Sequence, residues 1–337
     1  MEYDRKRFQE LDALRGLAAV AVLVFHYTSR YESQFEYVGR PFASLPYGYL
    51  GVQLFFMISG FVIFMTLCKV SRPLDFVVSR LSRLYPVYWT CVLLTSGIIL
   101  LMGLPGKEPT TLQVLVNMTM LQQLLFFKDV DGVYWTLLVE MIFYVSMFLL
   151  LITSQLHRIL PILLVWLAIA AMQIGIERFT TLRIPYTAEM FLNLKYIPHF
   201  ALGIAFYQYR KTSSHTPTSL LVIISSVSVV AFSGDLVATF ACLAFILLFQ
   251  LFLHEKLRFL AAKPLLFLGT ISYPLYLLHE NIGFVVIRQF TAYGLNINIC
   301  IAIATLTSLV LAALVTRYVE VPAMRYIRQQ YRARSTA

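Results

Sequence analysis

The sequence contains few charged residues for its length. Only 13% of its 337 residues are charged, whereas 59% are hydrophobic, and soluble proteins usually have about 25% charged residues. A soluble fold of this size has no interior large enough for so many apolar side chains, so we expect an all-α polytopic membrane protein. The formal charge of +10 is typical of basic loops on the cytoplasmic side of a membrane, and we expect no nucleic-acid partner.

Cysteine is also scarce. The four cysteines form no CxxC pair and no Cys/His cluster: Cys68, Cys91, Cys242 and Cys300. Three lie within apolar segments and Cys68 lies at the end of one, so we expect buried thiols without a disulfide or a bound metal. The sequence also lacks a GxSxG nucleophile motif and a metal-binding motif, which disfavours a hydrolase triad and a metalloenzyme.

Long apolar runs dominate what is present. Hydropathy predicts ten membrane spans, at residues 11–29, 48–68, 84–103, 133–153, 159–176, 190–209, 218–233, 236–253, 265–289 and 297–318. Charged residues 1–10 precede the first run, and no small-residue cleavage site follows it, so we expect an uncleaved first span. Residues 112–127 are short and contain polar side chains, which favours an interfacial or re-entrant helix.

The distribution of lysine and arginine predicts the orientation. With the N-terminus in the cytoplasm, 19 of the 27 basic residues fall in inner segments, which is the asymmetry expected when both termini are cytoplasmic. We expect one membrane domain over residues 1–337, with no fused soluble domain. Its short basic tail, residues 321–337, is expected to lie along the anionic inner leaflet.

The first span carries two ionisable residues, Arg15 and His26. Eleven residues turn a helix by about 1100°, so both side chains share one face and lie about 16 Å apart along the axis. A buried charge is costly, and such residues indicate a functional site. The alternative is that Arg15 snorkels to one surface and His26 caps the other end.

Two other spans carry ionisable groups at a similar depth. The predicted topology puts His26, Glu140 and His279 in the outer half of the membrane, where such groups should face the bundle interior or a wet cavity. His26 and Glu140 could form a histidine–carboxylate pair that acts as a general base. Unrelated polar contacts between helices are the alternative.

A basic segment lies at the predicted inner surface. Arg80 and Arg83 are three residues apart and therefore share a helix face. Two guanidinium groups with the nearby hydroxyls of Ser82 and Tyr85 would suit a polyphosphate. Ordinary anchoring by basic and aromatic residues is the alternative, and the more usual one at this depth.

Ser59 and Gly60 form a small-residue step within the second span. Such a step allows either the close approach of a ligand or tight helix packing, and the spacing alone favours packing.

Together these stretches resemble acyltransferase family 3, whose membrane proteins acylate bacterial cell-surface glycans. The matching stretches follow one another along nearly the whole chain: Leu11–Gly16 continuing to His26, Phe55–Phe61, Arg80–Pro86, Trp135–Glu140 and Ser272–His279. Thr136 departs from the pattern, because the family often has serine after the tryptophan, but it keeps the hydroxyl.

The resemblance implies a cytoplasmic acyl-CoA donor, usually acetyl-CoA, and an acceptor hydroxyl on an outer glycan such as O-antigen or exopolysaccharide. It implies a reaction centre of His26, Glu140 and Arg15, with Arg15 as a donor contact or a counter-charge. The donor end would contain Arg80, Arg83, Ser82 and Tyr85. The acceptor pocket would be lined by a third group: Ser272, Tyr273, Tyr276, His279, Trp135 and Ser59.

The expected location is the bacterial cytoplasmic (inner) membrane. Expected partners are membrane lipid, a coenzyme A thioester and a surface glycan, with a homo-oligomer or a separate periplasmic protein as further possibilities. The acyl group could pass directly to the glycan or through an acyl-His26 intermediate. A transporter or flippase of a glycan precursor is the chief alternative, since it would also carry intramembrane charges. A non-catalytic scaffold would leave these charges without a role.

Overall fold

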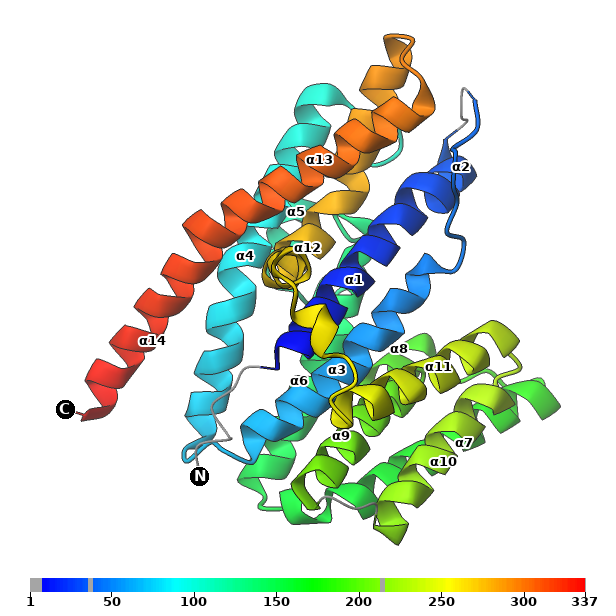
Figure 1. Ribbon diagram of the computed structural model, residues 1–337, viewed down its shortest axis with the longest axis vertical. Coiled ribbons are helices and arrows are strands. Elements are labelled where there is room, and N and C mark those ends of the chain that lie inside the picture. The colour runs from blue at the N-terminus through cyan, green and yellow to red at the C-terminus, as the bar shows by residue number, and fades with distance from the viewer. Residues whose placement is uncertain (1–7, 36–38, 213–215, 337) are drawn as a thin grey trace. The chain divides into compact units, whose positions relative to one another are not determined.

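The computed structural model describes residues 8–35, 39–212 and 216–336 (Figure 1), which contain helices and connecting segments but no strand. Most of the charged leader, residues 1–7, lies outside these ranges. The chain forms two compact units, considered separately below. The first comprises residues 1–51, 77–138 and 260–337, and the second comprises residues 52–76 and 139–259.

The first unit is built around α12, which packs against two other long helices, α1 and α13. Figure 1 shows that α13, η7 and α14 form one continuous helix, drawn in orange and red. The elements of this unit are α1 (Gln9–Phe25), η2 (His26–Arg30), α2 (Tyr31–Gln34), η3 (Gly48–Leu50), most of α4 (Pro73–Met102), α5 (Thr111–Asn117), η4 (Gly132–Tyr134), the start of α6 (Trp135–Ile152), the end of η6 (Arg258–Ala261), α12 (Lys263–Ala292), α13 (Ile297–Val315), η7 (Thr316–Glu320) and α14 (Val321–Thr336).

Helices α1 and α12 run parallel with their backbones in close contact. A Cβ on Gly269 would lie 2.2 Å from the carbonyl oxygen of Asp12, and one on Gly16 would lie 2.6 Å from the amide nitrogen of Gly269. Further along the pair, the Tyr27 hydroxyl occupies the space that a side chain at position 283 would need. Small residues let helices approach this closely, and the resulting register brings His26 beside the middle of α12.

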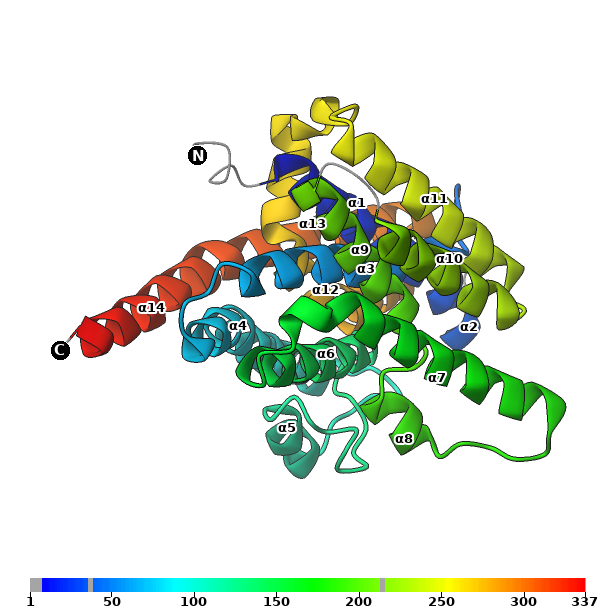
Figure 2. The same cartoon turned by 90° about the horizontal axis from the view of Figure 1, so that it is seen from below.

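In the second unit, helix α10 (Pro217–Phe232) packs against three neighbours (Figure 2), namely α7 (Ile159–Phe179), α9 (Ile197–Thr212) and α11 (Leu236–Leu253). The remaining elements are α3 (Gly51–Leu67), the rest of α6, η5 (Leu156–Arg158) and α8 (Tyr186–Phe191).

Gly60 serves tight packing in this unit. A Cβ at this position would lie 2.2 Å from the carbonyl oxygen of Phe200, and one on Gly203 would lie 2.0 Å from the carbonyl oxygen of Met57. The ring of Phe200 in turn stacks on that of Phe143, with 4.0 Å between centroids. Helices α3 and α9 therefore touch through backbone, as the packing interpretation of the Ser59–Gly60 step predicts.

Seven helical segments among the described residues are long and apolar enough to cross a membrane. They are residues 9–34, 48–67, 73–102, 132–152, 156–179, 236–253 and 297–334. The other three predicted spans are also helical, in α9, α10 and α12. The chain is thus a multi-pass membrane protein, while the count of ten spans and the cytoplasmic position of both termini stay predictions.

Residues 112–127 do not form a membrane-spanning helix. Helix α5 has seven residues, and turns follow it to residue 126. Seven residues extend a helix by only about 10 Å, against a hydrocarbon core of about 30 Å.

Candidate functional site: a buried histidine pair

The first unit brings two predicted site residues into direct contact. His26 follows α1 at the start of the π-helical segment η2, and His279 lies in the middle of α12. Nε2 of His279 lies 3.0 Å from Nδ1 of His26. His279 is fully buried and His26 is 9% exposed. Segments of π-helix occur frequently at functional sites.

Backbone carbonyls determine which ring nitrogens carry protons. Nδ1 of His26 lies 2.9 Å from the carbonyl oxygen of Val22, and Nδ1 of His279 lies 2.9 Å from that of Tyr276. A carbonyl can only accept a hydrogen bond, so each Nδ1 carries the proton. Nε2 of His279 then accepts from His26, which leaves Nε2 of His26 as the ring nitrogen that can take up another proton.

A carboxylate lies beside that nitrogen. Oε2 of Glu280 is 3.5 Å from Nε2 of His26, and the Glu280 side chain is almost fully buried. The absence of a side chain on Gly132 makes room for it, because a Cβ there would lie 2.4 Å from Oε2 of Glu280. An imidazolium formed at His26 would therefore be stabilised by an adjacent negative charge.

Asp131 anchors the connecting segment to α12. Its Oδ2 accepts the backbone N–H of Asn281 at 3.1 Å, and its Oδ1 accepts the backbone N–H of Val133 at 3.3 Å. Burial and the nearby Glu280 carboxylate raise the pKa of Asp131 well above its usual value. Since two carboxyl groups in one site resist double ionisation, a neutral Asp131 lets the pair carry a single negative charge.

The predicted partner of His26 was a different carboxylate. Glu140 belongs to the second unit, where its Oε1 accepts hydrogen bonds from Ser59 and Tyr144, each at 2.6 Å. Within the first unit, the carboxylate beside His26 is that of Glu280. The expected pairing of Glu140 with His26 stays a prediction. The catalytic role of Glu140 stays a prediction.

The residues predicted to line the acceptor pocket fall at several places. The Tyr276 hydroxyl lies 3.1 Å from Oγ1 of Thr136, which links α12 to the start of α6 beside the half-buried Trp135. Ser272 donates its hydroxyl to the carbonyl of Gly269. Ser59 lies in the second unit. The role of these residues in acceptor binding stays a prediction.

The predicted donor residues gather at the other end of the unit. Oγ of Ser82 accepts from Nε of Arg328 at 3.2 Å, and Nε of Arg83 lies 3.9 Å from Oε1 of Glu320. Nε of Arg80 donates to Oγ of Ser79 at 3.1 Å. Four arginines contribute to this basic cluster, which consists of Arg80, Arg83, Arg328 and Arg332.

Tyr85 points to another segment, since its hydroxyl donates to the carbonyl of Thr119. Arg15 is half-buried on α1, directly before the close contact between Gly16 and Gly269. It therefore lies at the end of the α1–α12 pair opposite to His26.

One residue connects the basic cluster to the histidines. The Tyr273 hydroxyl donates to the carbonyl of Leu84 at 3.1 Å, and Leu84 is the residue that follows Arg83. Tyr273 precedes His279 by six residues, or about 9 Å of helix. Tyr273 therefore links the segment that follows Arg83 to the helix that carries His279.

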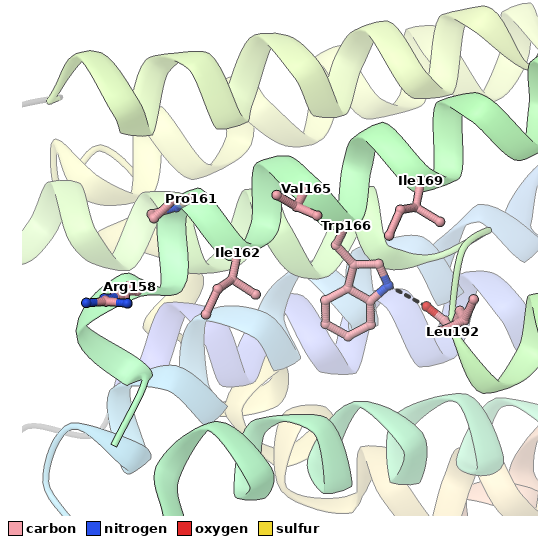
Figure 3. Close-up of a pocket in the computed structure, with 7 residues that line it drawn as sticks. All are labelled: Arg158, Pro161, Ile162, Val165, Trp166, Ile169 and Leu192. Atoms are coloured by element: carbon pink, nitrogen blue, oxygen red, sulfur yellow. Dashed lines mark hydrogen bonds between the residues drawn. The ribbon is translucent and has the colours of Figure 1, made fainter. Parts of the chain in front are cut away.

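The groove drawn in Figure 3 is of a different kind. It has a volume of about 460 Å³ in the second unit, is almost entirely apolar, and is lined mainly by α7 with Leu192. Trp166 forms part of its wall and donates its indole N–H to the Leu192 carbonyl. Arg158, at one end, is the charged residue of the lining. Such a lining offers no acid, base or nucleophile for group transfer.

The sequence prediction missed Glu280, Asp131 and Arg328 as site residues. The Asp131–Gly132 dipeptide directly before an apolar run was a recognisable helix-start signal, and Asp131 does cap η4. Glu280 adjoins the predicted His279. No local pattern distinguished Arg328 from the other arginines of the tail. Within the described residues, no group of three or more His, Cys, Asp or Glu side chains could hold a metal ion, and the expectation of no metal stays a prediction.

Comparison of the sequence with known proteins finds a matching family model and a set of related proteins. The family model described as an acyltransferase domain matches residues 8–318. The chain is 24% identical over 379 residues to the O-acetyltransferase OatA of Staphylococcus aureus, in strains NCTC 8325 / PS 47 and COL alike. That alignment covers 95% of this chain and 58% of the relative, so the chain spans little more than half the length of the curated relatives it matches. No solved structure gives a significant match.

Proposed function

Because the chain belongs to acyltransferase family 3, we propose that it is an integral-membrane O-acyltransferase. It would transfer an acetyl group from acetyl-CoA to a hydroxyl of a cell-surface or lipid-linked glycan, in the cytoplasmic membrane of a bacterium. The observation that carries this proposal is the buried contact between His26, His279 and Glu280, which has the composition of an acid–base centre. The family match and the OatA relatives support the reaction class.

The arrangement suits direct transfer. Nε2 of His26 takes the proton of the glycan hydroxyl while the hydroxyl oxygen attacks the thioester carbonyl carbon. The C–S bond then breaks, and the coenzyme A thiolate takes the proton from Nε2 as it leaves. Glu280 stabilises the imidazolium between these two steps, and His279 keeps the proton of His26 on Nδ1.

The basic cluster is the proposed donor site. Guanidinium groups bind phosphates through paired hydrogen bonds, and Arg83 directly precedes Leu84, the residue that contacts Tyr273. The pantetheine arm would follow α12 from there to His26. Arg15, at the same end of the α1–α12 pair, is proposed as a donor contact or counter-charge.

The acceptor is proposed to enter from the end of α1 that carries His26. Tyr276, whose ring lies beside that of His279, and Trp135 would contact the glycan. Within the second unit the Ser59 hydroxyl donates to the Glu140 carboxylate, and we propose a catalytic role for Glu140 and an acceptor contact for Ser59.

The test uses the purified protein in lipid nanodiscs with [14C]acetyl-CoA and a panel of bacterial surface glycans. Label on a glycan and stoichiometric release of coenzyme A are expected. Movement of a glycan or an acyl carrier across a sealed membrane without acetylation would instead indicate a transporter. Label retained on the denatured protein would indicate an acyl-enzyme in place of direct transfer.

A further inference from the structure

The basic cluster combines two segments that are nearly 250 residues apart in the sequence. Arg80 and Arg83 lie in α4, whereas Arg328 and Arg332 lie one turn apart in α14. Nε of Arg328 donates to Oγ of Ser82, and its Nη2 donates to the carbonyl of Ser79 at 3.1 Å. These two bonds fix the guanidinium of Arg328 against the turn of α4 that carries Arg80 and Arg83.

The cluster holds like charges close together. The positive charges of Arg80, Arg83 and Arg332 all act on Arg328, whose two hydrogen bonds above go to neutral acceptors. Glu320 contributes a carboxylate, which lies 3.9 Å from Arg83. Like charges held this close repel one another, and an anion between them relieves the repulsion, so the cluster favours a polyanionic ligand.

The donor of the proposed reaction carries its phosphates at two positions. Coenzyme A has a diphosphate, at the base of the pantetheine arm, and a separate phosphomonoester on the 3′ position of its ribose. A phosphomonoester bears a charge of about −1.5 to −2 near neutral pH. Two groups of anionic oxygens on one molecule would match two pairs of arginines on two helices.

The geometry decides which pair faces which phosphate. Arg83 adjoins Leu84, whose carbonyl contacts Tyr273 of α12, so the α4 arginines lie next to the helix that leads to His26. The pantetheine arm and the diphosphate that bears it therefore belong on the α4 side. Helix α14 continues α13 and ends away from α12 (Figures 1 and 2), which leaves the phosphomonoester for its arginines.

We propose that Arg328, assisted by Arg332, binds the 3′-phosphate of the coenzyme A donor and makes the enzyme select coenzyme A thioesters over thioesters without this group. The inference rests on the proposed function, because it assumes a coenzyme A donor. It assigns α14 a role in donor specificity in addition to the expected contact with the inner leaflet.

The experiment compares the binding of coenzyme A and 3′-dephospho-coenzyme A to the full-length protein in nanodiscs, by isothermal titration calorimetry. The wild type should bind coenzyme A about 10- to 100-fold more tightly, which is the effect of one hydrogen-bonded charged group. Arg328→Gln should lose most of this preference while its affinity for 3′-dephospho-coenzyme A stays the same. Arg332→Gln should lose part of it.

Two further variants control for folding and for general charge. Arg325→Gln removes an exposed arginine of the same helix and should keep the full preference. Arg328→Lys keeps the charge without the planar group and should keep an intermediate preference if Arg328→Gln fails to fold.

The outcomes separate the two proposals. A wild type that binds coenzyme A and transfers acetyl but does not distinguish the two nucleotides would overturn the inference alone. An unchanged preference in both Arg328→Gln and Arg332→Gln would do the same. A wild type that binds neither nucleotide would overturn the proposed function and the inference with it.

Discussion

At the scale of single residues, the decisive feature is the fixed proton position on two histidines. Carbonyl acceptors at Val22 and Tyr276 hold a proton on each Nδ1, so the next proton must arrive at Nε2 of His26. This atom faces Glu280. A base whose protonated form is stabilised by an adjacent carboxylate needs no metal or nucleophilic side chain to activate a hydroxyl.

Glu280→Gln should separate the two candidate carboxylates. We expect kcat to fall by about 10- to 1,000-fold, because the variant removes the carboxylate that stabilises the His26 imidazolium. The acidic limb of the kcat–pH profile should also move to lower pH, because the imidazolium loses its negative neighbour. KM for acetyl-CoA should change little. If Glu140→Gln moves this limb and Glu280→Gln does not, Glu140 is the partner of His26.

Gly132→Ala tests the same contact, between the Glu280 carboxylate and His26, by displacing the carboxylate. An added Cβ would meet both oxygens of the Glu280 carboxylate, so the carboxylate has to move away from its position beside His26. We expect a folded protein with a kcat loss similar to that of Glu280→Gln. Steady-state kinetics and a thermal melt would measure this. A variant with wild-type kcat would show that the position of the Glu280 carboxylate is unimportant.

At the scale of helices, the close contact between α1 and α12 sets the register of the site. Gly16 and Gly269 allow the two backbones to touch, and the register that results places residue 26 beside residue 279. The sequence predicted that both segments are helical spans, because hydropathy is a local property. It could not predict that they are neighbours, because depth along a membrane normal does not determine which helices pack together or how they are rotated.

Gly269→Val should disrupt this contact. A Cβ at residue 269 would lie 2.2 Å from a backbone oxygen of Asp12, which cannot yield as a flexible side chain can. We expect the free energy of unfolding to fall by about 3 kcal/mol, measured as earlier labelling of the buried Cys91 and Cys300 thiols during heating in detergent.

The matched control for that variant is Gly97→Ala. Gly97 lies within α4 and has nothing within 4 Å of its added Cβ, so alanine should stabilise the helix by about 0.5–1 kcal/mol. Equal stability losses in the two variants would contradict the proposed role of the α1–α12 contact.

At the scale of the whole molecule, composition and apolar runs predicted the class of protein correctly. The helical, multi-pass architecture followed from residue content, and the order of the short motifs indicated the family that the comparison identifies. The contact of Glu280 with His26 and the participation of Arg328 could not be predicted, since both depend on contacts between segments about 250 residues apart. Glu280, Asp131 and Arg328 are the residues that the structure adds to the site.

The most direct test of the account is acetyl transfer by the His26→Ala variant. Sealed proteoliposomes would receive [14C]acetyl-CoA on one side and the acceptor glycan on the other, and label on the glycan would be followed together with coenzyme A binding. We expect transfer to fall by about 10²- to 10⁴-fold, the usual contribution of a general base, with coenzyme A affinity unchanged. Transfer by His26→Ala at the wild-type rate would contradict the account.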